Sequence, residues 1–405
     1  MQRTLSPLLD KILKKWNKMA FLSGPRQVGK TTLARQYGEQ WGPCHYFNWD
    51  DLGDQKRLVK DPYFFAREDR EGGTPPLLLF DEIHKYARWK NYLKGAFDKY
   101  HGEFRFLITG SGRLDLFKKG GDSLLGRYFS LPLFPLTMGE VQGCFPNWKE
   151  TKELLCDLPP RKDSSRELYD QLFRFSGFPD PFLKAASDFY TLWFRERKGV
   201  LIRQDIRDAS PIREISLLEM LSHLIPERVG NPISLNALKE DVGVAFETVR
   251  DWVQLLASFY YLFRLTPFTA SLKRTLKKEA KVYLYDWVEV TEEGFRFENL
   301  VALHLLKAVE TWSATGEGSF RLHYLRDREK REVDFVVVRD SRPLLLVECK
   351  WSDTNFSPSL LYYQERLKVP VAVQLVHQRG VCRKREEGKL ARWVVSADHW
   401  LQILP

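Results

Sequence analysis

The chain has 405 residues, 43% of them hydrophobic, and Lys and Arg outnumber Asp and Glu by 63 to 53. This length predicts two to four domains with apolar cores, and the basic excess suits either a phosphate-bearing partner or an ordinary basic surface. The sequence has no apolar run as long as a membrane span and no signal-peptide core. Its scattered cysteines exclude a disulfide framework and a zinc site, so we expect a cytoplasmic protein without membrane contact. The cysteines are Cys44, Cys144, Cys156, Cys349 and Cys382.

The first predicted elements surround a glycine-rich loop. Residues 8–17 have apolar positions at helical spacing, and the apolar run at residues 19–22 predicts a strand. Residues 24–31 then read GPRQVGKT, which fits the pattern GxxxxGK[ST], and residues 32–37 predict a helix. A strand, this loop and a helix in succession are typical of a phosphate-binding loop.

Each residue type in the loop has a physical reason. Gly24 and Gly29 permit backbone angles that a side chain would forbid, so successive N–H groups can turn toward an anion. The helix that follows adds its positive N-terminal end. Lys30 would reach the β- and γ-phosphates of ATP, and the Thr31 hydroxyl would ligate Mg²⁺. We expect the nucleotide to be bound by Gly24, Pro25, Arg26, Gln27, Val28, Gly29, Lys30, Thr31 and Thr32.

A pair of acids follows a later strand. Residues 45–50 predict a second strand, and the apolar run at residues 77–80 predicts a third that is buried on both faces of a parallel sheet. Asp81 would lie at its carboxyl end and hold Mg²⁺ directly or through water. Glu82 would polarise the water that attacks the γ-phosphate.

The next strand, predicted at residues 104–109, ends in polar residues. Thr109 or Ser111 could lie between the acids and the γ-phosphate and orient the attacking water, or the segment could be a simple turn. Arg127 precedes a further strand predicted at residues 128–133.

Four of these segments resemble AAA-type ATPases: residues 24–33, 79–83, 108–111 and 125–127. In particular, the chain resembles a widespread prokaryotic family of uncharacterised ATPases. The resemblance implies an α/β fold with a P-loop AAA-type parallel sheet core, a helical lid, a winged helix and a C-terminal α/β nuclease-like domain. It also implies hydrolysis of ATP with Mg²⁺, and it makes Arg127 a candidate arginine finger that reaches the γ-phosphate of a neighbouring subunit in a homo-oligomer. The alternative for Arg127 is a surface or lid-facing arginine.

The region from residue 136 to residue 225 has a helical pattern of mixed charge. Residues 172–179 resemble the glycine-proline turn of the family's lid. The basic and aromatic stretches at residues 193–198 and 201–206 could line a nucleic-acid path, although an amphipathic connecting helix is favoured.

A helix–turn–helix pattern begins near residue 231. Ser234 can cap one helix, Gly243 makes the turn, and an apolar stripe at residues 246–256 marks a second helix available for a major groove. Residues 260–265 predict a wing strand. The basic wing would contact DNA, or the winged helix would only join two domains. The wing cations are Lys273, Arg274, Lys277, Lys278 and Lys281.

The last stretch predicts a second site. Residues 294–301 predict an amphipathic helix that carries Glu298, and residues 331–338 and 344–350 predict two strands joined by a polar turn. Glu348 and Lys350 share one face of their strand because side chains alternate, and Asp334 on the adjacent strand can meet them.

Two carboxylates and a lysine at a sheet edge suit metal-assisted cleavage of a phosphodiester. Asp334 and Glu348 would bind Mg²⁺, and Lys350 would activate water or stabilise the charged transition state. The set resembles the restriction-endonuclease-like, PD-(D/E)xK core, in which an acid at the place of Glu298 joins the cluster and Gln364 can assist. A surface hairpin of alternating charge, or an inactive module of the same fold, is the alternative.

These predictions divide the chain into an AAA-type ATPase core (1–135), a helical lid (136–225), a winged helix (226–290) and a nuclease-like domain (291–405). We expect an ATPase that uses ATP and Mg²⁺ and controls a nuclease-like, DNA-directed domain. The rival is a nucleotide-gated interaction protein whose nuclease fold is not catalytic. Glu82 favours hydrolysis, because a pure switch does not need it.

Overall fold

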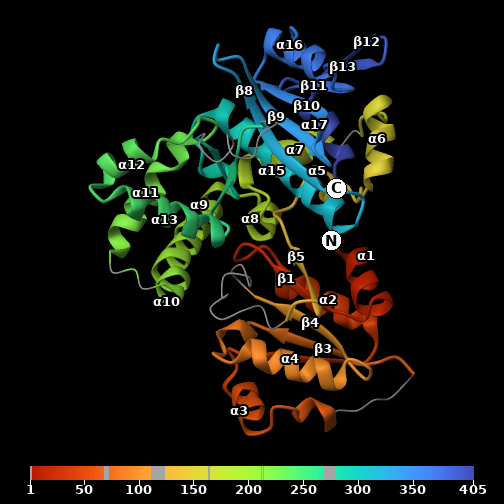
Figure 1. The fold of residues 1–405 in the computed structure, drawn as a ribbon, viewed down its shortest axis with the longest axis vertical. Coiled ribbons are helices and arrows are strands. Elements are labelled where there is room, and N and C mark those ends of the chain that lie inside the picture. The colour runs from red at the N-terminus through yellow and green to blue at the C-terminus, as the bar shows by residue number, and fades with distance from the viewer. Residues whose placement is uncertain are drawn as a thin grey trace. The chain divides into compact units, whose positions relative to one another are not determined.

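The computed structural model describes residues 2–67, 73–110, 124–162, 165–210, 212, 214–268 and 279–405. The chain splits into two compact units (Figure 1). The N-terminal unit comprises Gln2–Phe134 with Ser258–Tyr260, and the C-terminal unit comprises Pro135–Ala257 with Tyr261–Pro405. The finer division into four domains stays a prediction.

The N-terminal unit is built on a five-stranded parallel sheet, which confirms the predicted class of core. Its strand order is β2-β3-β4-β1-β5, and every pair in it is parallel. Because parallel strands end at one edge, the residues that follow β1, β3 and β4 lie side by side. The strands are β1 (Met19–Ser23), β2 (Cys44–Asn48), β3 (Leu77–Asp81), β4 (Arg105–Thr109) and β5 (Tyr128–Pro132).

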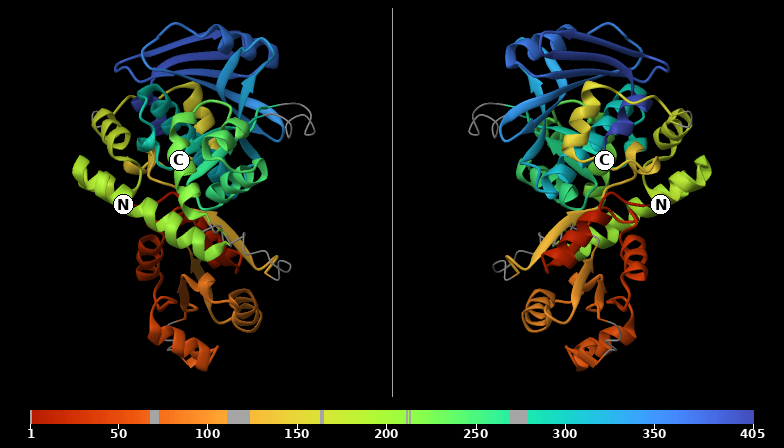
Figure 2. Two further views of the ribbon diagram at one scale, coloured as in Figure 1. Left: turned by 90° about the vertical axis from the view of Figure 1, so that its left-hand side faces the viewer. Right: turned by 90° about the vertical axis from the view of Figure 1, so that its right-hand side faces the viewer.

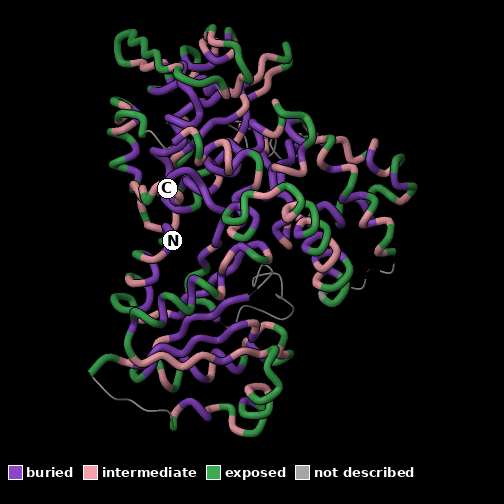
Figure 3. Tube along the Cα trace, turned by 180° about the vertical axis from the view of Figure 1, so that it is seen from behind, coloured by how far each residue is buried: buried purple, intermediate pink, exposed green. Residues whose placement is uncertain are grey.

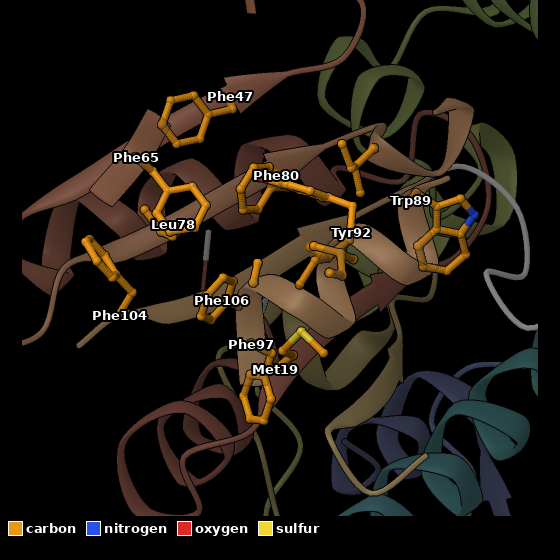
Figure 4. Close-up of a cluster of buried hydrophobic side chains, with 14 of the residues drawn as sticks. Met19, Phe47, Phe65, Leu78, Phe80, Trp89, Tyr92, Phe97, Phe104 and Phe106 are labelled. Carbon is orange, nitrogen blue, oxygen red and sulfur yellow. The ribbon is translucent and has the colours of Figure 1, made fainter. Parts of the chain in front are cut away.

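Helices cover both faces of this sheet. The helix α2 (Lys30–Trp41) packs on β2, β3 and β4. The helix α4 (Trp89–Tyr100) contributes Trp89, Tyr92 and Phe97 to a cluster of buried aromatic side chains on the other face (Figure 4). Each fully buried aromatic or aliphatic side chain stabilises the fold by about 1.5–3 kcal/mol. The remaining helical segments are α1 (Ser6–Asp10), η1 (Lys11–Lys15), α3 (Leu52–Lys60), η2 (Phe64–Arg67) and η3 (Ile83–Lys85).

The C-terminal unit begins with helices. In α9 (Ser187–Val200), Arg197 and Lys198 are buried at 3% and 6% exposure, so these two cations cannot line a nucleic-acid path and the connecting helix is the better interpretation. The other helical segments before residue 230 are α5 (Met138–Val141), α6 (Trp148–Cys156), α7 (Ser165–Phe175), α8 (Pro179–Lys184), η5 (Leu201–Ile206), α10 (Arg207–Ala209), α11 (Ile215–Leu224) and η6 (Pro226–Arg228).

The elements of the predicted helix–turn–helix are present. The helix α12 (Leu235–Val242) is capped by the Ser234 hydroxyl, which accepts a hydrogen bond from the Ala237 N–H at 3.3 Å. Gly243 ends α12 at φ 75°, and α13 (Phe246–Ser258) follows. The strand β6 (Leu262–Leu265) then pairs antiparallel with β7 (Lys281–Leu284). Four of the predicted DNA-contacting cations lie outside the described residues: Lys273, Arg274, Lys277 and Lys278.

A six-stranded sheet completes this unit in the order β12-β13-β11-β10-β9-β8 (Figure 2). The strands β9 and β10 form the predicted antiparallel hairpin, whereas β10 pairs parallel with β11. The strands are β8 (Phe320–Arg326), β9 (Glu332–Arg339), β10 (Arg342–Lys350), β11 (Val371–Val376), β12 (Cys382–Glu387) and β13 (Leu390–Ser396). The helical segments are η7 (Trp287–Glu289), α15 (Glu293–Ala314), α16 (Pro358–Leu367), α17 (Ala397–Trp400) and η8 (Leu401–Ile403).

The helix α15 corrects one expectation. The sequence predicts an amphipathic helix, but every residue from position 297 to position 305 is buried. Figure 3 colours the whole described chain by burial. The reason is its surroundings, because α15 contacts β7, β8, β9 and β10. In the described parts of the chain no helix is both long and apolar enough to cross a membrane, and the five cysteines are free thiols.

Candidate functional site

The glycine loop closes the carboxyl end of β1. Gly24 has φ 142°, and a Cβ atom there would collide with the carbonyl oxygen of Leu133, so only glycine fits. Gly29 has φ 94° and precedes α2. The predicted succession of strand, loop and helix is therefore present.

The loop is held from behind by Arg3, a residue that sequence reasoning missed. The Arg3 guanidinium is 6% exposed and donates through Nη1 to the Val28 carbonyl at 3.1 Å and through Nη2 to the Phe134 carbonyl. A buried arginine that satisfies a loop carbonyl fixes the backbone of that loop. No motif marked Arg3, because it lies 25 residues from Val28 in the sequence.

Lys30 lies over its own loop. Its Nζ donates to the carbonyls of Gly24 at 3.0 Å and Pro25 at 2.7 Å, and the residue is 7% exposed. The ammonium is thus held within the turn that would surround a phosphate. Of the other loop residues, Val28 is buried and Thr32 is exposed.

Asp81 is the centre of the oxygen cluster beside the loop. Its Oδ2 accepts hydrogen bonds from the Thr31 hydroxyl at 2.9 Å and the Tyr46 hydroxyl at 2.8 Å, and its Oδ1 accepts one from Thr109. The strand register explains this, because Asp81 pairs with Thr109 across β3 and β4. The predicted proximity of Thr109 to the acids is present, but its hydroxyl holds Asp81.

Tyr46 was also missed by sequence reasoning. Burial, followed by its hydrogen bond to Asp81, raises the pKa of Tyr46 to about 12. The Arg35 guanidinium lies 4.1 Å from the centroid of its ring. The only available signal was its place within the second predicted strand.

Glu82 begins a left-handed turn at φ 54°. Its N–H donates to the Thr109 carbonyl at 3.1 Å, and its side chain is 18% exposed, 3.5 Å from the Lys85 ammonium. Burial is the largest cause that raises the pKa of Glu82, and the charges of Lys85 and Lys30 oppose it. Backbone in this sparsely populated region is common at functional sites.

Arg127 lies at the amino ends of the parallel strands, whereas the loop lies at their carboxyl ends. Residue 128 pairs with Met19, the first residue of β1, whereas the loop follows the last. Five strand residues span roughly 16 Å. The Arg127 guanidinium instead pairs with Asp98 on α4, with 2.6 Å between Nε and Oδ1. The structure therefore does not bring Arg127 to the loop of its own chain, and Ser111 lies outside the described residues.

The predicted residues of the second site come together across β9 and β10. The Cys349 N–H donates to Asp334 Oδ2 at 2.8 Å, and the Asp334 N–H donates to Glu348 Oε2 at 3.4 Å. Lys350 Nζ lies 2.8 Å from Glu348 Oε1. We call Glu298, Glu332, Asp334 and Glu348 the carboxylate cluster.

Lys281 corrects the prediction of a DNA-contacting wing lysine. It is 1% exposed, and its Nζ lies 3.2 Å from Glu298, 2.5 Å from Glu332 and 3.7 Å from Asp334. Burial by itself would lower the pKa of Lys281, but the three carboxylates raise it. The strand β7 therefore places a buried cation in the carboxylate cluster and has no exposed charge at this position.

The carboxylate cluster is short of positive charge. Burial and the nearby Asp334 raise the pKa of Glu348 to about 8 and that of Glu298 to about 7. Among the described residues, no group of three or more His, Cys, Asp and Glu could hold a metal ion. Gln364 is not part of this cluster, because its amide donates to the Ala391 carbonyl and accepts from Arg392.

Three family models match successive parts of the chain. A model described as an AAA domain matches residues 16–142, which include the phosphate loop, Asp81 and Arg127. Two domains of unknown function, DUF8612 and DUF4143, match residues 166–287 and 293–398. With the five-stranded parallel sheet, the first match defines an AAA-type P-loop ATPase domain in the N-terminal part of the chain. The winged-helix and nuclease-like assignments stay predictions.

Relatives span most of the chain. An uncharacterised protein of Methanocaldococcus jannaschii is 24% identical over 411 residues, which cover 96% of this chain and 87% of that protein. An uncharacterised protein of Mycobacterium tuberculosis is 23% identical over 345 residues, which cover 80% of this chain and 68% of that protein. The solved structure of Aeropyrum pernix ORC1 in complex with DNA is 15% identical, covers 75% of this chain and 92% of that one, and has a TM-score of 0.32. This score is too low to carry an argument.

Proposed function

We propose that the N-terminal unit binds ATP with Mg²⁺ and hydrolyses it to ADP and phosphate. The observation that carries the proposal is the 2.9 Å hydrogen bond between Thr31 and Asp81, directly beside Lys30 and the glycine loop. A hydroxyl and a carboxylate supply the oxygen ligands that Mg²⁺ prefers. The donor set therefore fits the ion, with Thr31 and Asp81 as the residues that would hold it.

The residues divide the reaction between them. Lys30 exchanges its two loop carbonyls for phosphate oxygens, and the loop N–H groups hold the phosphates in place. Mg²⁺, when bound, neutralises charge on the phosphate oxygens. Glu82 accepts a proton from water as the water oxygen bonds to the γ-phosphorus, while the bond from that phosphorus to the β–γ bridging oxygen breaks. A raised pKa suits this role, because a general base works best with a pKa near the operating pH. Thr109 and Tyr46 are positioning residues that act through Asp81.

Two substitutions separate binding from hydrolysis. Lys30→Ala should abolish ATP binding, whereas Glu82→Gln should keep binding and lower turnover by about 10²- to 10⁴-fold. Glu39→Gln, an exposed position on α2, is the matched control and should retain both. Unchanged turnover in Glu82→Gln would refute the role of Glu82, and ATP binding without turnover in the wild type would favour the nucleotide-gated switch.

We further propose that the carboxylate cluster supports metal-dependent cleavage of a phosphodiester in DNA. The meeting of Asp334, Glu348 and Lys350 across one hairpin supports this. Mg²⁺ is commonly held by one or two carboxylates, with water completing its shell, and the raised pKa values of Glu348 and Glu298 mark a site where a cation would relieve repulsion. Asp334 and Glu348 would hold the ion. Lys350 would orient water or neutralise the developing charge.

Calorimetry with Mn²⁺ tests the metal site. In a Lys30→Ala background, which disables the ATP loop, Mn²⁺ should bind and Asp334→Ala should remove that binding. If the carboxylates serve only as salt-bridge partners of Lys281 and Lys350, Mn²⁺ will not bind and Asp334→Ala will only lower stability. Lys350→Ala should retain the metal and lose cleavage. Metal binding without cleavage of any DNA or RNA would leave a nuclease-like fold without nuclease activity.

A further inference from the structure

An exposed tryptophan adjoins the carboxylate cluster. Trp351 directly follows Lys350 at the end of β10 and is 38% exposed. Its ring stacks on His377, with centroids 4.0 Å apart and planes at 8°. One face of the indole is thus covered. Because more than a third of the residue is still exposed, part of the indole is accessible to a ligand.

The surroundings fix the orientation of this ring. The rings of Phe297 and Phe173 pack beside it at centroid distances of 6.4 Å and 6.0 Å, with planes at 75° and 45° to its own. His377 is itself held in place. Its backbone N–H donates to the Lys350 carbonyl at 3.3 Å, and its ring Nδ1 lies 2.9 Å from the Tyr169 hydroxyl. A ligand that stacks on Trp351 would therefore meet a rigid surface and lose little side-chain entropy there.

Charge and position favour a nucleic acid over an apolar peptide. Lys350 precedes Trp351 in the chain, but its ammonium is paired with Glu348 at 2.8 Å. The Arg296 guanidinium lies 5.5 Å from the centroid of Phe173, a ring in contact with Trp351. Phe297, which contacts Trp351, precedes Glu298 of the carboxylate cluster. A flat aromatic surface beside a guanidinium can bind an unpaired base and its phosphate.

We propose that Trp351 stacks one unpaired base of a single-stranded nucleic acid and so places the adjoining phosphodiester at the carboxylate cluster. The inference rests on the proposed nuclease-like function and names its substrate class. A base inside a duplex is already stacked on both faces and cannot use this surface, so the proposal excludes intact duplex as the favoured ligand. Stacking does not discriminate between bases, so we expect little sequence preference.

Fluorescence anisotropy with labelled oligonucleotides tests this inference in the full chain without divalent metal. Trp351→Ala should weaken binding of a 15-nucleotide oligothymidine by about 5- to 100-fold, and Trp351→Phe should weaken it much less, because the phenyl ring can still stack. The dependence of affinity on salt should not change, because no phosphate contact is removed. A matched oligonucleotide with abasic sites should bind wild type and Trp351→Ala equally. Trp16→Ala, a 40% exposed tryptophan of the other unit, is the control and should bind like the wild type.

Three outcomes would overturn the inference. The first is equal affinity of wild type and Trp351→Ala for oligothymidine. The second is that Trp351→Ala weakens binding of the abasic oligonucleotide as much as that of oligothymidine. The third is that the wild type binds duplex as tightly as the single strand, or more tightly. Binding of an apolar peptide at Trp351 with no oligonucleotide binding would replace it with a protein partner. The proposed nuclease-like function is tested separately by Mn²⁺ binding that depends on Asp334, because this binding does not require Trp351.

Discussion

Asp81 shows how three elements fix one side chain. Thr31 from α2, Tyr46 from β2 and Thr109 from β4 all donate hydroxyl hydrogen bonds to its two oxygens. Hydrogen bonds to a charged acceptor contribute about 1.5–3 kcal/mol each. Three of the roughly four lone-pair sites of the carboxylate are then occupied, so the one that remains has a fixed direction, which suits the ligation of a cation.

Removing one donor tests this positioning. Tyr46→Phe should leave ATP binding within about twofold and lower turnover by about tenfold, since Asp81 would lose a bond to its charged group worth about 1.5 kcal/mol. The Mg²⁺ concentration that gives half-maximal turnover should rise. Tyr100→Phe, a tyrosine of the same unit with no bond to Asp81, is the control. An unchanged Mg²⁺ requirement in Tyr46→Phe would show that this hydroxyl has no role in holding Asp81 for the ion.

Some functional residues could be predicted from the sequence and others could not. The pattern of glycines, Lys30 and Thr31 could be predicted because adjacent residues make the whole phosphate loop. Arg3 and Lys281 could not, because their partners are distant in the chain and a lysine in a basic stretch has the same local signal whether exposed or buried. Only the pairing of β7 with β6, and the packing of α15 on β7, bring Lys281 to the acids.

At the scale of elements, α15 carries a histidine that must stay neutral. His304 is fully buried, its Nε2 accepts the Met138 N–H at 3.0 Å, and its Nδ1 lies 2.8 Å from the Leu300 carbonyl. Burial lowers the pKa of His304 to about 3. Protonation would place a donor against the Met138 N–H, so this histidine joins α15 to α5 only in its neutral form.

The pH dependence of stability follows from this shift. Between pH 6.5 and 3 the unfolded chain binds a proton at His304 that the folded chain does not, so this contribution is complete above pH 6.5 and is lost as the pH falls. The loss should be about 1.4 kcal/mol per pH unit. Urea unfolding at pH 7 and pH 5.5 should show that His304→Gln, which keeps an acceptor and does not titrate, removes this part of the slope. A surface control, His101→Gln, should keep it. The same slope in His304→Gln and wild type would contradict the account.

Elements differ in how far they could be predicted. The buried strands β1, β3 and β4 are continuous apolar runs bounded by polar turns, which local pattern identifies well. The helix α15 was placed correctly but expected to have a polar face, because residues 294–301 contain Arg296, Glu298 and Asn299. Glu298 and Asn299 are instead buried and hydrogen-bonded inside the unit. The Asn299 side chain, for example, bonds both the N–H and the carbonyl of Leu284. Tertiary partners decide that outcome, and local sequence does not contain them.

At the scale of the whole molecule, Arg127 raises the question of assembly. We propose that Arg127 acts as an arginine finger on a neighbouring subunit, since its place at the far edge of the sheet excludes the loop of its own chain. Arg127→Ala should lower hydrolysis by about 10³-fold with ATP binding retained, and mixing it with Glu82→Gln subunits should restore part of the activity. Asp98→Asn breaks the ion pair but keeps the arginine, so its turnover should stay near that of the wild type. A mixture that co-assembles without any recovery would leave Arg127 as a surface ion-pair partner of Asp98, a role of little energetic weight.

We propose that ATP hydrolysis in the N-terminal unit controls the DNA-directed C-terminal unit. The most direct measurement is steady-state ATP turnover of the full chain with and without linear and single-stranded DNA, beside Glu82→Gln under the same conditions. We predict measurable turnover in the wild type, a several-fold change when DNA is added, and turnover lowered by about 10²- to 10⁴-fold in Glu82→Gln. ATP bound without turnover in every condition, or turnover that no form of DNA alters, would contradict this account.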